Sequence, residues 1–132
     1  MLDRIHNGLA GYMERKNIKR PAERTDGAVV ILVDRRYRVF CRPAPHGDLV
    51  LESQIVELPE SPAEVDSTIR ECLYASWVRM RDYPEVPALS EDGAAIVIQL
   101  RLPSDATVDE FEVALKSYVD SLADWRRIFR VV

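Results

Sequence analysis

The 132-residue sequence contains few of the residues on which metal sites and nucleophilic catalysis depend. It has two cysteines, Cys41 and Cys72, and two histidines, His6 and His46, and these residues lack the spacing of a zinc site. His46 follows Cys41 by five residues, which is not a nucleophile motif. The sequence has no phosphate-binding glycine loop, and Gly27, Gly47 and Gly93 each fit a turn. We therefore predict that the protein is not an enzyme and that it uses no metal or other cofactor.

Long apolar runs are also missing. No stretch reaches the roughly eighteen consecutive apolar residues that a membrane-spanning helix needs. The N-terminus, MLDRIHNGLAGYMERKNIKR, carries charges throughout and lacks the apolar core of a secretory signal. Two lone cysteines are normally reduced inside cells. The sequence therefore predicts a cytoplasmic protein that does not insert into a membrane.

The charge is acidic overall and unevenly placed. The formal net charge is −4, but residues 1–42 contain ten Lys or Arg against five Asp or Glu, whereas residues 43–124 contain five against seventeen. The basic part has no platform of aromatic residues on which bases stack, and the acidic body repels phosphates. We predict no binding to nucleic acid.

Hydrophobic periodicity predicts the element order αβββαββα. The expected elements are a helix from Leu2 to about Asn17, strands over Ala28–Val33, Tyr37–Arg42 and Leu49–Leu58, a helix from Ser61 to Met80, strands over Ala88–Glu91 and Ala94–Leu102, and a helix from Thr107 onward. The apolar run Ala28–Val33 is typical of a central strand buried on both faces. Short turns favour an antiparallel sheet. The prediction is one α+β domain over residues 1–132, with a five-stranded antiparallel sheet and three helices.

The last helix has the clearest pattern. Large apolar residues recur every three or four positions and form one stripe, namely Phe111, Leu115, Tyr118, Leu122, Trp125 and Phe129. Burying six such side chains stabilises the fold by on the order of 10 kcal/mol before entropy is subtracted, so we expect the stripe to cover the sheet. Thr107 and Glu110 form a capping box at its start, and Ser61 and Glu64 form another at the preceding helix.

Four segments together resemble one known family. They are TDGAVVILVDRRYRVFCRPAPHGDLVLESQIVELP, IRECLYASWV, ALSEDGAAIVIQLRLP and VDEFEVALKSYVDSLADWRRIF, of which the last is the most specific. In this ordered pattern the chain resembles the class I chaperones of bacterial type III secretion, which include the Tir and Yop effector chaperones. Two features depart from the family pattern: Ala75-Ser76-Trp77 replaces the usual asparagine of the central helix, and the first helix contains two glycines.

The resemblance implies a homodimer in the bacterial cytoplasm. Such a chaperone binds the N-terminal region of a secreted effector in extended form, keeps it stable and secretion-competent, and targets it to the secretion apparatus, where the secretion ATPase is a further partner. By resemblance, the dimer interface comprises Leu73, Trp77, Met80, Ala88, Leu89 and Ser90. The expected effector-binding residues are Leu2, Ile5, Leu9 and Tyr12 of the first helix, and Val39, Val50 and Val97 of the sheet.

Each assignment has an alternative. Leu73 and Met80 at helical spacing are also typical of core residues, the first helix has an apolar stripe that can pack on the sheet, and a register change of one residue turns Val39 and Val50 toward the core. For the function, the alternative is a dimeric cytoplasmic adaptor or regulatory protein-binding domain of the same fold. A small-molecule-binding or enzymatic α+β domain is a third interpretation, for which the sequence offers no site residues.

Overall fold

The computed structural model describes residues 5–19 and 27–131, and within these it contains three α-helices and five strands. The elements are α1 (Asn7–Arg15), β1 (Val29–Val33), β2 (Tyr37–Pro43), a 3-10 turn (Pro45–Gly47), β3 (Leu49–Glu57), α2 (Pro62–Arg79), β4 (Val86–Leu89), β5 (Ala95–Leu102) and α3 (Val108–Ile128). The predicted element order is confirmed. Leu2 lies outside the described residues, so the predicted start of the first helix is not addressed.

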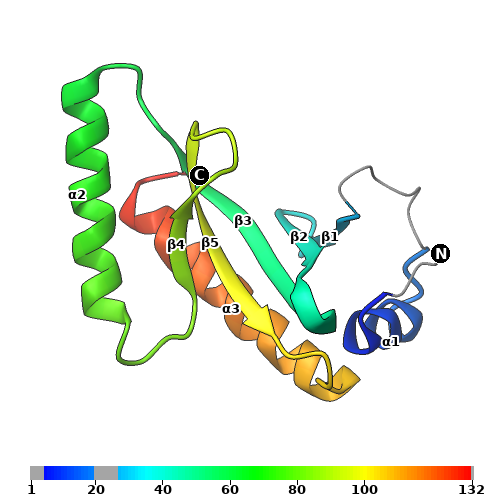
Figure 1. Cartoon of the computed structure of the whole chain (residues 1–132). Coiled ribbons are helices and arrows are strands. Elements are labelled where there is room, and N and C mark those ends of the chain that lie inside the picture. Colours follow the sequence, from blue (N-terminus) through cyan, green and yellow to red (C-terminus); the bar gives the residue numbers. More distant parts are fainter. Residues whose placement is uncertain (1–4, 20–26, 132) are drawn as a thin grey trace.

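The strands form one antiparallel sheet in the order β1-β2-β3-β5-β4 (Figure 1). The predicted α+β class with a five-stranded antiparallel sheet is therefore confirmed. The position predicted for the first strand is wrong, because β1 pairs only with β2 and lies at an edge. Its Leu32 side chain is 58% exposed. A short apolar run does not distinguish a central strand from an edge strand that another chain can cover.

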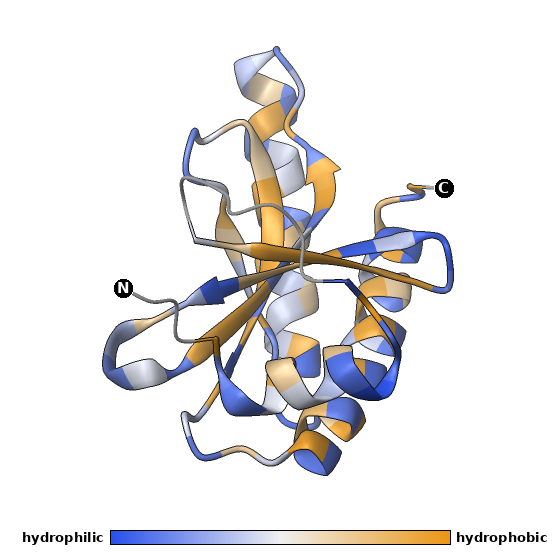
Figure 2. Ribbon diagram, turned by 90° about the vertical axis from the view of Figure 1, so that its right-hand side faces the viewer, coloured by the Kyte–Doolittle hydropathy of each residue, from blue (hydrophilic) through white to orange (hydrophobic). Residues whose placement is uncertain are grey.

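Helix α3 covers one face of the sheet and forms the core with it. Phe111, Leu115, Tyr118, Leu122 and Trp125 are all buried, as the stripe predicts, while Phe129 at the end of the helix is half-buried. The buried Tyr118 hydroxyl donates a 3.0 Å hydrogen bond to the carbonyl oxygen of Ile98, which fixes the helix against β5. Figure 2 shows largely hydrophobic strands, whereas the helices alternate hydrophobic and hydrophilic residues.

The start of α3 is capped as predicted, whereas the start of α2 is not. Thr107 Oγ1 accepts from the Glu110 amide at 3.1 Å, and the Glu110 carboxylate accepts from the Thr107 amide at 2.9 Å. Ser61 occupies the N-cap position of α2, but its side chain makes no capping hydrogen bond, so the second predicted capping box is wrong. Pro62 at the first helical position starts α2 with a preset backbone angle instead.

Helix α1 packs against α3 at the side of the molecule (Figure 1). The ring centres of Tyr12 and Phe111 are 5.2 Å apart, and Gly11 faces Val108 so closely that a Cβ atom built on it would overlap a Val108 methyl carbon. Glycine at this position therefore permits the close approach of the two helices, although it weakens α1 by itself.

Candidate protein-binding surfaces

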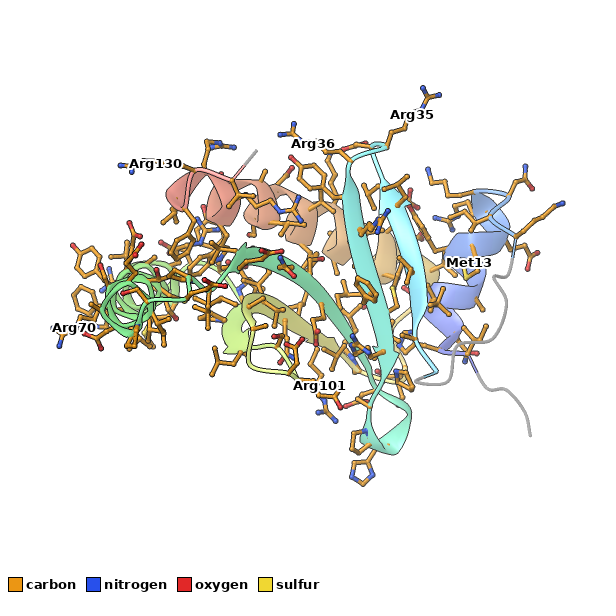
Figure 3. All side chains as sticks on the ribbon, turned by 90° about the horizontal axis from the view of Figure 1, so that it is seen from above. Met13, Arg35, Arg36, Arg70, Arg101 and Arg130 are labelled. Atoms are coloured by element: carbon orange, nitrogen blue, oxygen red, sulfur yellow. The ribbon has the colours of Figure 1, made fainter. Side chains whose placement is uncertain are left out.

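Helix α2 lies at one side of the molecule, away from the centre of the sheet, and contacts the sheet at β4 (Figures 1 and 3). Its only buried side chains are Cys72 and Ala75. By contrast, four of its large apolar residues are between 62% and 70% exposed, namely Leu73, Tyr74, Trp77 and Met80. The alternative that placed Leu73 and Met80 in the core of the chain is therefore wrong. An exposed apolar face of this size on a helix marks an interaction surface.

Strand β4 continues this surface along the sheet edge. It pairs only with β5, and its exposed Val86 and Leu89 side chains add to the apolar area. The strand comprises Val86–Leu89 and not Ala88–Glu91, because an edge strand tolerates Pro87. We call the six most exposed large apolar side chains of α2, its C-cap residue and β4 together the α2–β4 surface. It consists of Leu73, Tyr74, Trp77, Met80, Val86 and Leu89.

The two remaining residues of the predicted interface lie beside this surface. Ala88 is half-buried within β4. Ser90 lies after the strand, where its hydroxyl donates to Asp92 at 2.7 Å and accepts from the Ala95 amide at 3.1 Å. These hydrogen bonds occupy the Ser90 hydroxyl in the β4–β5 turn, so its side chain has a local structural role.

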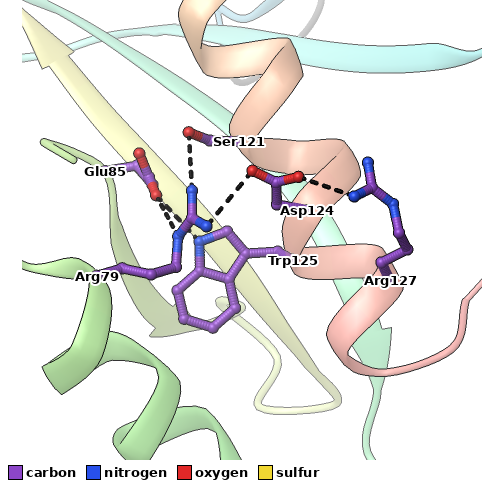
Figure 4. Close-up of polar contacts among 6 residues, drawn as sticks. All are labelled: Arg79, Glu85, Ser121, Asp124, Trp125 and Arg127. Atoms are coloured by element: carbon purple, nitrogen blue, oxygen red, sulfur yellow. Dashed lines mark hydrogen bonds and ion pairs between the residues drawn. The ribbon is translucent and has the colours of Figure 1, made fainter. Parts of the chain in front are cut away.

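A polar cluster joins the end of α2 to α3 (Figure 4). The Arg79 guanidinium pairs with Glu85 at 3.3 Å and with Asp124 at 3.4 Å, and it donates to the Ser121 hydroxyl at 3.2 Å. The indole nitrogen of Trp125 donates to the same Glu85 oxygen at 3.1 Å. The Glu85 side chain is 2% exposed and that of Arg79 is 14% exposed, so this ion pair is shielded from water.

This cluster sets the position of α2. The Arg79 guanidinium carbon also lies 4.0 Å from the ring centre of Tyr83, so the turn after α2 folds back over the same group. Because buried charges are stable only when paired, the contacts of Arg79 restrict the angle at which α2 leaves the domain. No periodic pattern predicts this cluster, because Glu85 lies outside any regular element and Asp124 is distant from Arg79 in the chain.

His6 is a second residue whose role the sequence did not indicate. Its Nδ1 atom accepts from the amides of Gly8 and Leu9 at 3.1 and 3.3 Å, so it caps α1. Its Nε2 atom lies 2.7 Å from the carbonyl oxygen of Pro103. Because Nδ1 accepts, Nε2 carries the proton and donates to Pro103. A buried histidine thus ties α1 to the β5–α3 connection.

Three of the predicted effector-binding residues are not accessible. Leu9, Val39 and Val97 are 1%, 0% and 4% exposed. Leu9 and Val39 belong to the core cluster, because the apolar side of α1 packs inward and β2 alternates with Val39 facing the core. These positions therefore offer no surface to a partner in this conformation. Ile5, Tyr12 and Val50 are half-buried and keep accessible area.

The surroundings of Val50 are polar as well as apolar. In the strand register Val50 lies between Arg42 of β2 and Arg101 of β5. Arg42 lies 3.5 Å from Glu52, and Arg101 pairs with Asp48 at 2.9 Å. The hydrogen bond from Arg101 lowers the pKa of the Asp48 carboxyl below its usual value. This face of the sheet therefore presents a mixed surface and not a continuous apolar groove.

A shallow apolar hollow lies on the outer side of α3. Its volume is about 620 Å³, and it lies between α3, the end of β5 and the loop after α2. Leu100, Leu102, Val113 and Ala114 contribute apolar lining.

The described residues contain no cluster of potential metal ligands. Burial raises the pKa of the Cys41 thiol to about 12, so this cysteine is not activated as a nucleophile.

The fold and these surfaces define a protein-binding domain, in which apolar side chains are displayed on an exposed helix and on sheet edges. None of the helices in the described ranges is long and apolar enough to cross a membrane. The chain belongs to the Tir chaperone protein (CesT) family, whose model matches residues 9–126. The predicted family is confirmed: the chain is a type III secretion chaperone of effector proteins, and this family membership places it among non-enzymatic proteins.

Solved structures show the same fold. The match to a chain of the ExsC–ExsE complex has a TM-score of 0.68 and a sequence identity of 18%. It covers 91% of this chain and 89% of the matched chain. The match to the structure of the Yersinia pestis chaperone SycH with a YscM2 fragment has a TM-score of 0.63 and a sequence identity of 16%. It covers 89% of this chain and 96% of the matched chain. The match to a chain of the ExoU–SpcU complex of Pseudomonas aeruginosa has a TM-score of 0.66 and a sequence identity of 10%. It covers 89% of this chain and 94% of the matched chain. No curated protein matches the chain significantly in sequence.

Proposed function

We propose that this chain is a homodimeric chaperone that holds the N-terminal region of a secreted effector in extended form and keeps it competent for secretion. The observation that carries the proposal is the α2–β4 surface, whose large apolar side chains are between 55% and 70% exposed. Exposed apolar area of this kind is stabilised when a second surface removes it from water.

A second copy of the chain fits the α2–β4 surface. In a two-fold dimer the same patch is used on both sides, so Trp77 and Leu73 of one copy would pack on the equivalent helix of the other. The free edge of β4 can approach its own copy antiparallel. A stable interface buries about 1,200–2,000 Å² in total, and large side chains such as Trp77, Tyr74 and Met80 are suited to this.

The effector would bind elsewhere, at α1 and the outer sheet. Accessible apolar area remains at Ile5 just before α1, at Tyr12 of α1 and at Val50 of β3, and Leu32 on β1 is well exposed. The free edge of β1 can also accept a further strand through its backbone groups. Extended binding leaves an effector without a globular fold, so it can be threaded through a narrow channel.

The remaining steps follow from this role. We propose that the chaperone acts in the bacterial cytoplasm and delivers the bound effector to the secretion apparatus, including its ATPase. Support comes from the similar structures in which chaperones are seen with partners, such as SchA with HopA1 and SpcU with ExoU.

Co-purification from the source cells under secretion-inducing conditions tests the proposal. Bound proteins are identified and then digested with protease while still in the complex. We expect a partner that is protected only along an extended stretch near its N-terminus. A partner protected as a whole folded domain would instead support an adaptor, and the absence of any protein partner would contradict both functions.

A further inference from the structure

Two segments far apart in the sequence bring arginines to one side of the molecule. Arg35 and Arg36 lie in the turn between β1 and β2, and Arg126, Arg127 and Arg130 lie at the end of α3. Figure 3 shows Arg35, Arg36 and Arg130 along the same side, with Arg101 on the opposite side. We call these five residues the arginine surface. They form a basic area on a chain whose net charge is −4.

The Tyr37 ring holds the two segments together. The guanidinium carbons of Arg36 and Arg126 lie 5.2 and 5.5 Å from its ring centre. Arg126 also donates two hydrogen bonds, of 3.3 and 3.0 Å, to the carbonyl oxygen of Gln54. Stacking and hydrogen bonding thus fix the orientation of these guanidinium groups before any partner binds, which lowers the entropy lost on binding.

Two of the arginines occupy backbone positions that favour glycine. Arg35 has a φ of 56° and Arg130 a φ of 58°, both in the left-handed region. Arg130 follows the end of α3, where glycine is the usual residue, and Arg35 lies in a hairpin turn, where glycine or asparagine is usual. The backbone is strained by an arginine at each position. Strain kept at exposed sites is typical of a functional requirement for the side chains.

Intramolecular pairing does not account for the surface. Arg127 pairs with Asp124 at 3.1 Å, and Asp124 also pairs with Arg79. Among the described residues, Arg35, Arg36 and Arg130 have no ion pair with an Asp or Glu side chain. The dipole of α3 favours cations at its end, but it does not explain the arginines of the β1–β2 turn.

We propose that the arginine surface binds an acidic segment of a polypeptide partner. Guanidinium groups pair with carboxylates through two parallel hydrogen bonds, and arginine is better suited to this than lysine. A polypeptide is favoured over a lipid or nucleic acid because the surface adjoins the free edge of β1, whose backbone groups match only another peptide chain. The arginine surface shares no residue with the α2–β4 surface.

The test uses a fluorescently labelled octa-glutamate peptide as the probe and octa-glutamine as its uncharged match, with binding followed by fluorescence anisotropy. The variant R35E/R130E reverses two charges of the arginine surface. The control K19E/K116E makes the same change of net charge at two other exposed positions. We expect R35E/R130E to weaken octa-glutamate binding by at least about tenfold and K19E/K116E to change it less than about twofold.

A second variant, R35G/R130G, separates binding from folding. Glycine relieves the strain at both positions, so we expect a Tm equal to or above that of the parent, together with weaker octa-glutamate binding. The proposal is overturned if the parent does not bind octa-glutamate, or if both glutamate variants lose binding equally. Tighter binding to phosphatidylserine vesicles or to a single-stranded oligonucleotide than to the peptide would also overturn it.

Discussion

Helices α2 and α3 are both long, and both carry large apolar and aromatic residues, yet the chain uses them in opposite ways. Helix α3 buries Phe111, Tyr118, Leu122 and Trp125 against the sheet, whereas α2 leaves Trp77 and its neighbours in solvent. The polar cluster around Arg79 links the two helices. The comparison shows that one helix stabilises the monomer and that the other is available for association.

The largest effect is expected from shortening a core side chain of α3. Phe111→Ala removes a fully buried ring that contacts α1 through Tyr12, and we expect a loss of about 3–5 kcal/mol in the free energy of unfolding. Urea unfolding at a protein concentration low enough to give monomers measures it. A loss below about 1 kcal/mol would show that α3 does not organise the core.

The next largest effect is expected at the link between the two helices. Glu85→Ala leaves Arg79 and the Trp125 indole without their shared acceptor. We expect a loss of about 2–3 kcal/mol, less than for a fully buried pair because Asp124 remains next to Arg79. Arg70→Ala is the matched control, since its pair with Asp66 is exposed and contributes about 0.3–0.5 kcal/mol. Equal losses in the two variants would contradict the role of the cluster.

A smaller effect is expected where α1 meets α3. Gly11→Ala gains helix propensity but places a methyl group against Val108, so we expect a net loss of about 1–2 kcal/mol from overpacking. The double variant Gly11→Ala with Val108→Ala should recover part of that loss, because the shorter side chain makes room. Thermal unfolding of the three proteins checks this, and a stabilising Gly11→Ala would show that the helices can separate without cost.

The smallest effect on folding is expected on α2 itself. Trp77→Ala removes an exposed ring whose ring neighbour is Tyr74, so the free energy of unfolding of the monomer should change by less than about 0.5 kcal/mol. Urea unfolding under the same dilute conditions as for Phe111→Ala gives the direct comparison. A loss similar to that of Phe111→Ala would place Trp77 in the core and would remove the difference between the two helices.

The sequence predicted the fold well where one pattern had one physical solution. The stripe from Phe111 to Trp125 required a covering sheet, and Thr107 with Glu110 defined the start of α3. It failed where two solutions share one pattern: the run Ala28–Val33 fits both central and edge strands, and the apolar residues of α2 fit both a core and an interface. Whether the apolar residues of α2 are exposed depends on where α2 lies relative to the sheet. A local sequence pattern does not specify that position.

The candidate surfaces were therefore predicted less well than the fold. Trp77 and Leu73 were assigned to an interaction surface by family resemblance, and both are exposed. Leu9 and Val39 were assigned to effector binding, but they are buried, because a face of a helix or strand cannot be placed from spacing alone. The contacts of Arg79 and His6 join residues that are distant in sequence, so only the structure reveals them.

The most direct test of the central claim is the mass of the protein in solution by sedimentation equilibrium, for the parent and for Trp77→Glu. We expect a dimer for the parent and a folded monomer for Trp77→Glu, because a charge at the centre of an apolar interface is desolvated without a partner. A monomeric parent, or a Trp77→Glu variant that remains as tight a dimer as the parent, would contradict the assignment of the α2–β4 surface.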